Sequence, residues 1–357
     1  MIQFEDNNIR PEEFDKIGMN YLIQKYGALL NNLKPQIEKS RIFQSEILEN
    51  IAKKNINWEM IARHLFYAFA TCDAFGQNPF DFQNIWVAYT RIRILPIVEF
   101  NKTMQSYSLS PKVVERQEFL KVALFNLAAE LSGSIQLLNS EEGKRFWLAH
   151  AQMLGRIIEL VYEEVNDRFN LQTLEKPEIV LKKYKTVNSP LLRSRLLETQ
   201  INIISSVAAI NTENINWLPF FEKLRQLLDD LSDIKEDIEI GRITYPVLVG
   251  LHREKSNGEL LNIINKFWTQ KLKNTKCNLN KKEWSAIKTI LLKNNSIQYT
   301  CDKILKWYKK TKQALNENTL PGNVESLSLI LELKKAYLYR LRKNNFDDKK
   351  PVFVIHN

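Results

Sequence analysis

Carboxylates crowd into one short stretch of this sequence, residues 226–246, which reads QLLDDLSDIKEDIEIGRITYP. Asp229, Asp230 and Asp233 occupy positions i, i+1 and i+4, and Asp237 follows one helical turn later. On a helix, residues four apart lie on the same face, so these carboxylates would stack. Like charges this close repel one another unless a cation joins them. Because Mg²⁺ prefers oxygen ligands and commonly bridges carboxylates to phosphates, the stretch predicts a Mg²⁺ site for a phosphate-bearing ligand.

The alternative for the same stretch is an ordinary acidic helix face exposed to solvent. Two observations weigh against it. The acidic run stands in a chain whose net charge is +10. Apolar side chains also interleave with the aspartates, so the helix is amphipathic and partly buried; these side chains are Leu227, Leu228, Leu231 and Ile234.

Several motifs in and before this stretch resemble those of the trans-isoprenyl diphosphate synthases. DDLSD matches the second aspartate-rich motif of that family, DDxxD, and Gln226 matches the glutamine of its FQxxDDxxD, with Arg225 in place of Phe. GRITYP resembles the family's GKxTxP segment, with Arg242 in place of the lysine. Upstream, Lys185-Thr186 resembles the family's Lys-Thr motif and stands 41 residues before Gln226, close to the family's spacing.

The stretch DIKED with the following GRITYP also resembles the DxxED…GRxxxP pattern of squalene and phytoene synthases. Both families share one fold and one substrate chemistry, so both resemblances imply the class I isoprenoid synthase superfamily. The matched motifs cover 62 residues, Lys185–Pro246. DDxxD alone is a weak signal, whereas the ordered set at these spacings is specific.

The resemblance implies which residues bind substrate and metal. Asp229, Asp230 and Asp233 would be catalytic residues that coordinate Mg²⁺ on a diphosphate, and Asp237 is a further candidate ligand. Metal ions and cationic side chains would stabilise the negative charge that builds on departing pyrophosphate. An apolar cavity would keep water away from the allylic cation.

Residues outside the aspartates receive substrate-binding roles by the same resemblance. Lys185 would be a catalytic cation that contacts diphosphate oxygens, with Thr186 supporting it nearby. Gln226 would line the cavity near the prenyl chain, and Arg242 would lie near the diphosphate. Phe69 is a candidate cavity wall residue. Ordinary core packing is the alternative for Phe69 and for three further phenylalanines, Phe66, Phe220 and Phe221.

The first aspartate motif of these enzymes, expected on an early helix, has no intact copy here. Asp73 in FYAFATCDAFGQ is the best candidate for a metal ligand there, and Asp81 just past the next turn is a substitute. The alternative for Asp73 is a cap or turn residue, because it ends an apolar helix beside Gly and Pro. The segments that bind isopentenyl diphosphate in chain-elongating synthases are also missing, which speaks against ordinary head-to-tail elongation.

Helical periodicity runs through almost the whole sequence, and Gly (10) and Pro (11) are scarce, so we predict an all-α fold. The prediction is a single helical bundle of the isoprenoid synthase type over residues 1–345, with ten or more helices around a central apolar cavity, and a loose C-terminal tail over residues 346–357. Residues 176–181 are expected to be a connector. Helices are expected over residues 11–34, 36–54, 58–76, about 82 onward with a kink at Pro96, 111–138, 141–170, 190–210, 217–240, 246–273, 281–313 and 323–344.

Composition narrows the partners and the location. No apolar run approaches the length of a membrane span, and no nucleic-acid-binding motif is present. The polar, acidic N-terminus is no signal peptide, and three widely spaced cysteines fit reduced, buried thiols. We therefore expect a cytoplasmic protein that neither spans a membrane nor binds nucleic acid, with lysines on a solvated or anion-binding surface. A homodimer is expected by analogy with the family.

The sequence leaves several functions open. One is Mg²⁺-dependent ionisation of an allylic prenyl diphosphate followed by prenyl transfer to an acceptor, and a second is cyclisation of the same substrate by a terpene synthase. A third is a non-catalytic subunit that regulates an active synthase, suggested by the degenerate first motif. The fourth is an unrelated helical interaction protein. Carboxylates of Asp73 or Asp81 facing Asp229 across a cavity would favour catalysis.

Overall fold

The structure is a computed structural model, and most of its described residues are helical. Twelve α-helices and one 3-10 helix are complete within the described residues, which contain no strand, so the predicted all-α fold is confirmed. Residues 141–149 are helical as well. The described residues are 10–38, 58–90, 139–149, 169–185, 215–254, 258–274, 277–317, 320–344 and 346. The elements are α1 (Pro11–Glu38), α3 (Trp58–Ala74), η1 (Pro79–Phe82), α4 (Gln83–Tyr89), α8 (Leu171–Glu175), α9 (Pro177–Lys185), α11 (Leu218–Ser232), α12 (Ile234–Glu239), α13 (Tyr245–Glu254), α14 (Glu259–Lys273), α15 (Lys281–Lys293), α16 (Ser296–Glu317) and α17 (Glu325–Lys343).

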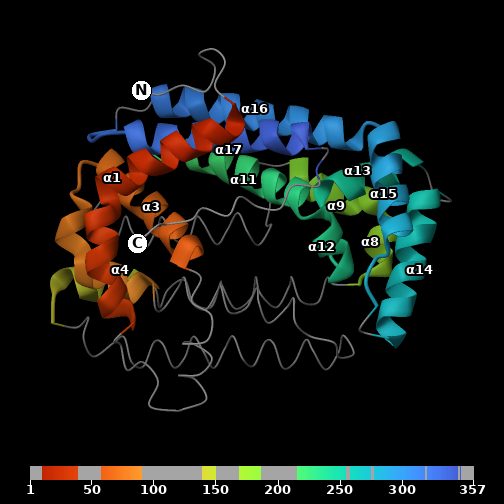
Figure 1. Ribbon diagram of the computed structural model, residues 1–357, viewed down its shortest axis with the longest axis horizontal. Helices are drawn as coiled ribbons and strands as arrows, with labels where there is room; N and C mark the ends of the chain where they lie inside the picture. The colour runs from red at the N-terminus through yellow and green to blue at the C-terminus, as the bar shows by residue number, and fades with distance from the viewer. Residues whose placement is uncertain are drawn as a thin grey trace.

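Long helices run side by side along one edge of the molecule (Figure 1). Helix α16 packs against both α11 and α17, and α17 packs against the N-terminal helix α1. Helices α1, α3 and α4 gather at one end of this edge, whereas α12, α14 and α15 gather at the other. The helix that carries the aspartates, α11, therefore lies between the two ends of the described bundle.

Helix α11 is formed by a sequence with a strong apolar face. Pro219 stands in its first turn, where the missing backbone N–H leaves no hydrogen bond unmade. Its apolar side chains recur every three to four residues and are almost completely buried against α13, α16 and α17; among them are Leu224, Leu227, Leu228 and Leu231. The aspartates that follow these leucines thus lie on a helix that is mostly buried.

Several predicted boundaries were wrong. A break was expected at Pro35, but α1 continues through this proline to Glu38, because a proline in the last turn removes a single backbone hydrogen bond. The expected connector over residues 176–181 is helix α9, which has a proline as its first residue. Gly258 precedes α14 and divides the expected helix 246–273 into two.

The expected helix 281–313 is also two helices, and asparagines stand before the first of them and between the two. Asn280 caps the start of α15 by accepting hydrogen bonds from the backbone of Lys282 and Glu283, at 2.9 Å each. Asn295 ends the segment with a φ of 55°, a left-handed conformation that asparagine tolerates better than most residues. The corner at 294–295 contains neither glycine nor proline, so it was not predicted from the sequence.

The described residues also bear on the expectations about membrane spans and cysteines. Within the described residues no helix is both long and apolar enough to cross a membrane. Cys72 and Cys301 are buried as expected, and Cys277 is partly exposed. The predicted segments 39–54, 91–138 (with Pro96), 150–168 and 190–210 lie outside the described residues, as do residues 347–357. Phe346, the first residue of the predicted tail, donates its N–H to the carbonyl oxygen of Leu341. The division into one domain and a tail stays a prediction.

Candidate functional site

The aspartate stretch is bent at Asp233. Helix α11 ends at Ser232 and α12 begins at Ile234, so the expected continuous helix over residues 217–240 was wrong. Asp233 has φ −108° and ψ 15°. The backbone hydrogen bonds nevertheless continue through the bend, because the N–H of Asp233 donates to Asp229 (3.0 Å) and the N–H of Asp237 donates to Asp233 (2.8 Å). The i, i+4 relation of the three aspartates is retained.

Asp230 is turned into the protein and is only 1% exposed. One carboxylate oxygen accepts a hydrogen bond from Nε2 of Gln226 at 2.6 Å, and the other accepts the backbone N–H of Tyr245 at 3.1 Å. Tyr245 is the first residue of α13, so the carboxylate lies at the positive end of that helix. Asp230 therefore fastens α11 to α13.

A buried lysine balances the charge of Asp230. Lys223 is 2% exposed and lies two turns before Asp230 on the same helix. Burial lowers the pKa of Lys223 to about 8, while the nearby carboxylates of Asp230 and Glu222 act in the opposite direction. Both oxygens of Asp230 and its charge are thus engaged within the protein.

Asp229 is placed differently from its neighbour. Its side chain is 24% exposed, and its Oδ2 lies 3.9 Å from Nη1 of Arg225 one turn earlier. His64 of α3 is close to this pair. Burial and the positive charges of Arg225, Lys334 and Arg63 lower the pKa of His64 to about 4, and the charge of Asp229 opposes them. Charged groups of three helices, α3, α11 and α17, therefore gather around His64, which lies near Asp229.

The sequence did not predict the part that α3 and α17 play around Asp229. Arg63, His64 and Lys334 belong to no motif and lie more than a hundred residues from Asp229 in the chain. One signal was available, because Arg63 and His64 interrupt a helix that is otherwise apolar nearly all round. Polar residues on such a helix need partners or ligands in the interior.

The remaining acidic residues of the stretch have partners close by. Asp233 is 8% exposed and accepts a hydrogen bond from the hydroxyl of Ser232 at 2.7 Å. Asp237 is 3% exposed, and its Oδ1 lies 3.4 Å from Nη1 of Arg242. The arginine of the GRITYP segment thus points back to the last aspartate.

A glycine allows the turn that brings Arg242 back to Asp237. Gly241 has a φ of 81°, and a Cβ at this position would lie 2.3 Å from a ring carbon of Phe169. Phe169 also donates its N–H to the carbonyl oxygen of Gly241 at 2.6 Å. Side chains larger than hydrogen are therefore excluded from the turn that connects α12 to Arg242.

The Lys-Thr motif can be placed only in part. Lys185 is the last residue of α9, and α9 packs against α13, whose first residue contacts Asp230. The helix that ends in the lysine is therefore a neighbour of the aspartate region. Thr186 lies outside the described residues.

Asp73 is held by other groups at the end of α3. Its carboxylate accepts a hydrogen bond from the hydroxyl of Tyr26 and forms an ion pair with Lys25 at 2.7 Å. Its backbone oxygen accepts the N–H of Asn323 at 2.9 Å. The loop approaches so closely that a Cβ on Gly322 would lie 1.9 Å from this oxygen. Asp73 thus joins the end of α3 to α1 and to the loop before α17.

The two candidate aspartate motifs lie far apart. The rings of Tyr67 on α3 and Phe221 on α11 stack with centroids 5.4 Å apart, and His64 lies near Asp229, so the two helices run in opposite directions. Asp73 follows Tyr67 by six residues and Asp229 follows Phe221 by eight. At the helical rise, Asp73 and Asp229 are separated by roughly 20 Å. The structure does not bring them together.

The other predicted residues of the early helices have contacts of their own. Phe69 is fully buried, and its ring lies 5.4 Å from that of Trp86 and 5.6 Å from that of Tyr26. This is the core packing that was the alternative for Phe69. Asp81 is exposed in η1 and accepts a hydrogen bond from Asn78 at 3.1 Å.

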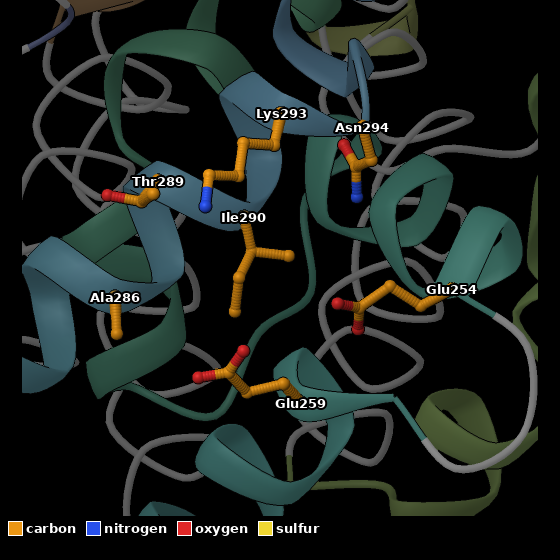
Figure 2. Close-up of a pocket in the computed structure, with 7 residues that line it drawn as sticks. All are labelled: Glu254, Glu259, Ala286, Thr289, Ile290, Lys293 and Asn294. Carbon is orange, nitrogen blue, oxygen red and sulfur yellow. The ribbon is translucent and has the colours of Figure 1, made fainter.

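A surface hollow of about 390 Å³ lies between α13, α14 and α15, with Lys293 and Ile290 on one side and Glu254 and Glu259 on the other (Figure 2). It opens at the C-terminal end of α13, the opposite end from Tyr245. Because charged groups line this hollow and it is remote from the aspartates, it is not the predicted apolar cavity.

Comparison with known proteins identifies the fold. No protein-family model matches the sequence, and no curated protein matches it. A decaprenyl diphosphate synthase from Rhodobacter capsulatus superimposes with a TM-score of 0.60 and 13% identity, over 91% of this chain and 100% of that one. A polyprenyl synthase from Caulobacter crescentus CB15, complexed with calcium and isoprenyl diphosphate, gives a TM-score of 0.55 and 15% identity, over 89% and 97%.

This chain has the all-α fold of the polyprenyl diphosphate synthases. The predicted fold type is thereby confirmed. The squalene- and phytoene-synthase features of the DIKED segment stay a prediction. At this level of identity the likeness concerns the fold, so the chemistry has to be argued from the residues described above.

Proposed function

We propose that this protein binds an allylic prenyl diphosphate, ionises it with Mg²⁺ and pyrophosphate release, and transfers the prenyl group to an acceptor. The supporting observation is the contrast within DDLSD in a chain with a prenyl synthase fold. Asp230 is buried and bound by contacts within the protein, whereas Asp229 keeps a partly exposed carboxylate beside Arg225 and near His64. That is the environment a diphosphate requires.

The carboxylates fit Mg²⁺ in a limited way. Among the described residues, no three His, Cys, Asp or Glu side chains form a group that would hold a metal ion by themselves. Mg²⁺ in phosphate-transfer sites usually needs one or two carboxylates, because substrate phosphates and water fill its other positions. Asp229 fits this role, and Asp233 and Asp237 are the next candidates. Asp230 fits this role less well, because it is only 1% exposed and each of its oxygens already accepts a hydrogen bond.

Each group would contribute a distinct effect. Bound Mg²⁺ would neutralise charge on the departing pyrophosphate. Arg225 and Lys334 would add positive charge from α11 and α17, and His64, neutral at pH 7, would offer an N–H or a lone pair. Lys185 is proposed to contact the diphosphate from the end of α9, with Thr186 beside it. Arg242 would reach the same region through the Gly241 turn.

Two further residues are proposed to lie beside or behind the prenyl site. Gln226 is almost buried and donates to Asp230, so we propose that it fixes this carboxylate while bordering the prenyl site. Phe69 is proposed only as part of the core behind that site. A homodimer and a cytoplasmic location remain parts of the proposal and are checked by light scattering and cell fractionation.

The test is pyrophosphate release from geranyl, farnesyl and geranylgeranyl diphosphates, with Mg²⁺ and with EDTA. We expect Mg²⁺-dependent release, and a decrease of about 100-fold for Asp229→Asn, typical of losing one group that stabilises developing charge. Asp302→Asn is the matched control, because Asp302 is an exposed aspartate of α16 whose contact is Gln298. An adduct among the extracted products would identify a transferase, and a cyclic hydrocarbon would identify a terpene cyclase.

A second function is favoured by one observation. Asp73 is tied to Lys25 and Tyr26 roughly 20 Å from Asp229, so the chain has no opposed pair of aspartate motifs among its described residues. A non-catalytic subunit of an active synthase would need no such pair. Folded protein that releases no pyrophosphate alone, but changes the rate or product length of an added prenyl synthase, would establish this alternative.

A further inference from the structure

Positive charge is concentrated in the last quarter of the chain. Residues 259–344 carry 18 Lys and Arg against 6 Asp and Glu, a net charge of +12. The whole chain has a net charge of +10, so the remaining residues are slightly acidic. The basic character of this protein is therefore a property of the region that forms α14–α17.

Helix α16 presents the clearest basic surface in this region. Tyr299, Lys303, Lys306 and Lys310 follow one another at intervals of four, three and four residues, so they share one face of the helix. Lys306 and Lys310 are exposed, while the opposite face packs on α11 and α17. The helix lies at the outer edge of the molecule and is about 33 Å long (Figure 1).

Aromatic rings hold several of these cations in place. The guanidinium of Arg253 lies 5.0 Å from the ring centre of Tyr299, and the ammonium of Lys303 lies 5.4 Å from it. Lys310 lies 5.2 Å from the ring centre of Trp307. Cation–π contacts of this kind reduce the freedom of the long side chains and keep the charges on the surface.

Apolar groups are exposed at the same place. Leu292 is 44% exposed at the end of α15 and Tyr299 is 36% exposed in the first turn of α16, on either side of the corner at 294–295. Arg253 reaches this corner, because its Nη1 donates to the carbonyl oxygen of Asn294. An exposed leucine and tyrosine among cations match the boundary between lipid headgroups and acyl chains.

We propose that this surface binds anionic membrane lipids. We call it the α16 face and define it by Arg253, Leu292, Tyr299, Lys303, Lys306 and Lys310. Its cations would contact lipid phosphates, and Leu292 with Tyr299 would enter the headgroup layer. A nucleic acid would match the charge but would leave the exposed leucine without a partner. The binding does not depend on the proposed activity, although a prenyl substrate would reside in the same membrane.

The experiment is flotation of the full-length protein with vesicles of phosphatidylcholine alone and of phosphatidylcholine mixed with phosphatidylglycerol. We expect binding to the anionic vesicles only, weakened as salt shortens the range of the charges. Each lysine near an anionic surface contributes about a fivefold factor, so Lys306→Glu/Lys310→Glu should reduce the partition coefficient by about 25-fold or more. Circular dichroism verifies that the variant is folded.

Two exposed lysines on other helices provide the control. Lys16→Glu/Lys182→Glu makes the same change in net charge at exposed lysines of α1 and α9 and should preserve most of the binding. Equal losses in both double variants, equal binding to neutral vesicles, or binding to duplex DNA without binding to anionic vesicles would each overturn the proposal. Pyrophosphate release from soluble geranyl diphosphate should be the same in both double variants, which separates this test from that of the activity.

Discussion

Two aspartates at opposite ends of the α3–α11 pair show how position decides what a carboxylate does. Asp73 ends α3 and is closed off by Lys25, Tyr26 and the loop at Gly322. Asp229 lies beside His64 and Arg225 and keeps a quarter of its side chain exposed. Asp73 therefore connects structural elements, whereas Asp229 keeps a carboxylate that a ligand can reach.

The same contrast exists between two adjacent residues. Asp229 and Asp230 differ by one position, or about 100° around the helix, and this rotation turns one outward and the other into the interior. The buried carboxylate holds the start of α13, and the exposed one is available for a metal. A motif of three aspartates can therefore combine structural and ligand-binding tasks.

The largest effect that we expect in this comparison is on stability. Asp230→Ala would leave Gln226, the N–H of Tyr245 and the buried Lys223 without this partner, so it should lower the free energy of unfolding by about 3 kcal/mol. Urea denaturation measures the difference. Asp229→Ala is the matched variant and should change the free energy of unfolding by less than about 1 kcal/mol. Equal destabilisation by the two variants would remove the distinction between them.

A smaller effect should appear on acidification. The pKa of His64 is about 4 in the folded protein, below the ordinary value of 6.5, so the unfolded chain binds more protons between these pH values. The free energy of unfolding should therefore fall as the pH drops from 6.5 to 4, by about 2 kcal/mol. Urea titrations across this range should show a shallower slope for His64→Gln, whereas His252→Gln, at an exposed histidine, should retain the slope. An unchanged slope in both variants would contradict the assignment.

The smallest effect concerns Asp73. Asp73→Asn removes an ion pair of a partly buried lysine but keeps a hydrogen-bond acceptor for Tyr26, so it should cost about 1 kcal/mol of stability. Pyrophosphate release, if present in the wild type, should remain within about twofold, since Asp73 lies too far from Asp229 to share a metal. A loss as large as that of Asp229→Asn would show that Asp73 belongs to the reacting site after all.

Much of the fold was predictable because its signals are local. Helical periodicity located α1, α3 and α17 to within a few residues, and the scarcity of glycine and proline predicted the all-α class. The i, i+4 register of Asp229, Asp233 and Asp237 was also correct. The bend at Asp233 was not predicted, because nothing in the residues themselves prevents a continuous helix there.

The arrangement of the site was less predictable because it depends on contacts between distant segments. Periodicity shows that a helix has a buried face, but it does not say that Asp230 will meet the start of α13. The antiparallel pairing of α3 with α11 is likewise absent from the sequence, and it separates Asp73 from Asp229. Gly241 belongs to a segment that was matched to a family motif, while the reason for a glycine there, the ring of Phe169, required the structure.

The packing of α17 on α1 has a consequence for how the protein is made. Arg340 forms a buried ion pair with Asp15 at 2.7 Å, and Ser326 accepts a hydrogen bond from Lys25, so the last helix completes the surroundings of the first. At a synthesis rate of about 5–20 residues per second, α1 has to wait tens of seconds for this partner. The part of α1 that α17 covers lacks its native partner during that time. The native packing of α1 is thus postponed until α17 has been synthesised.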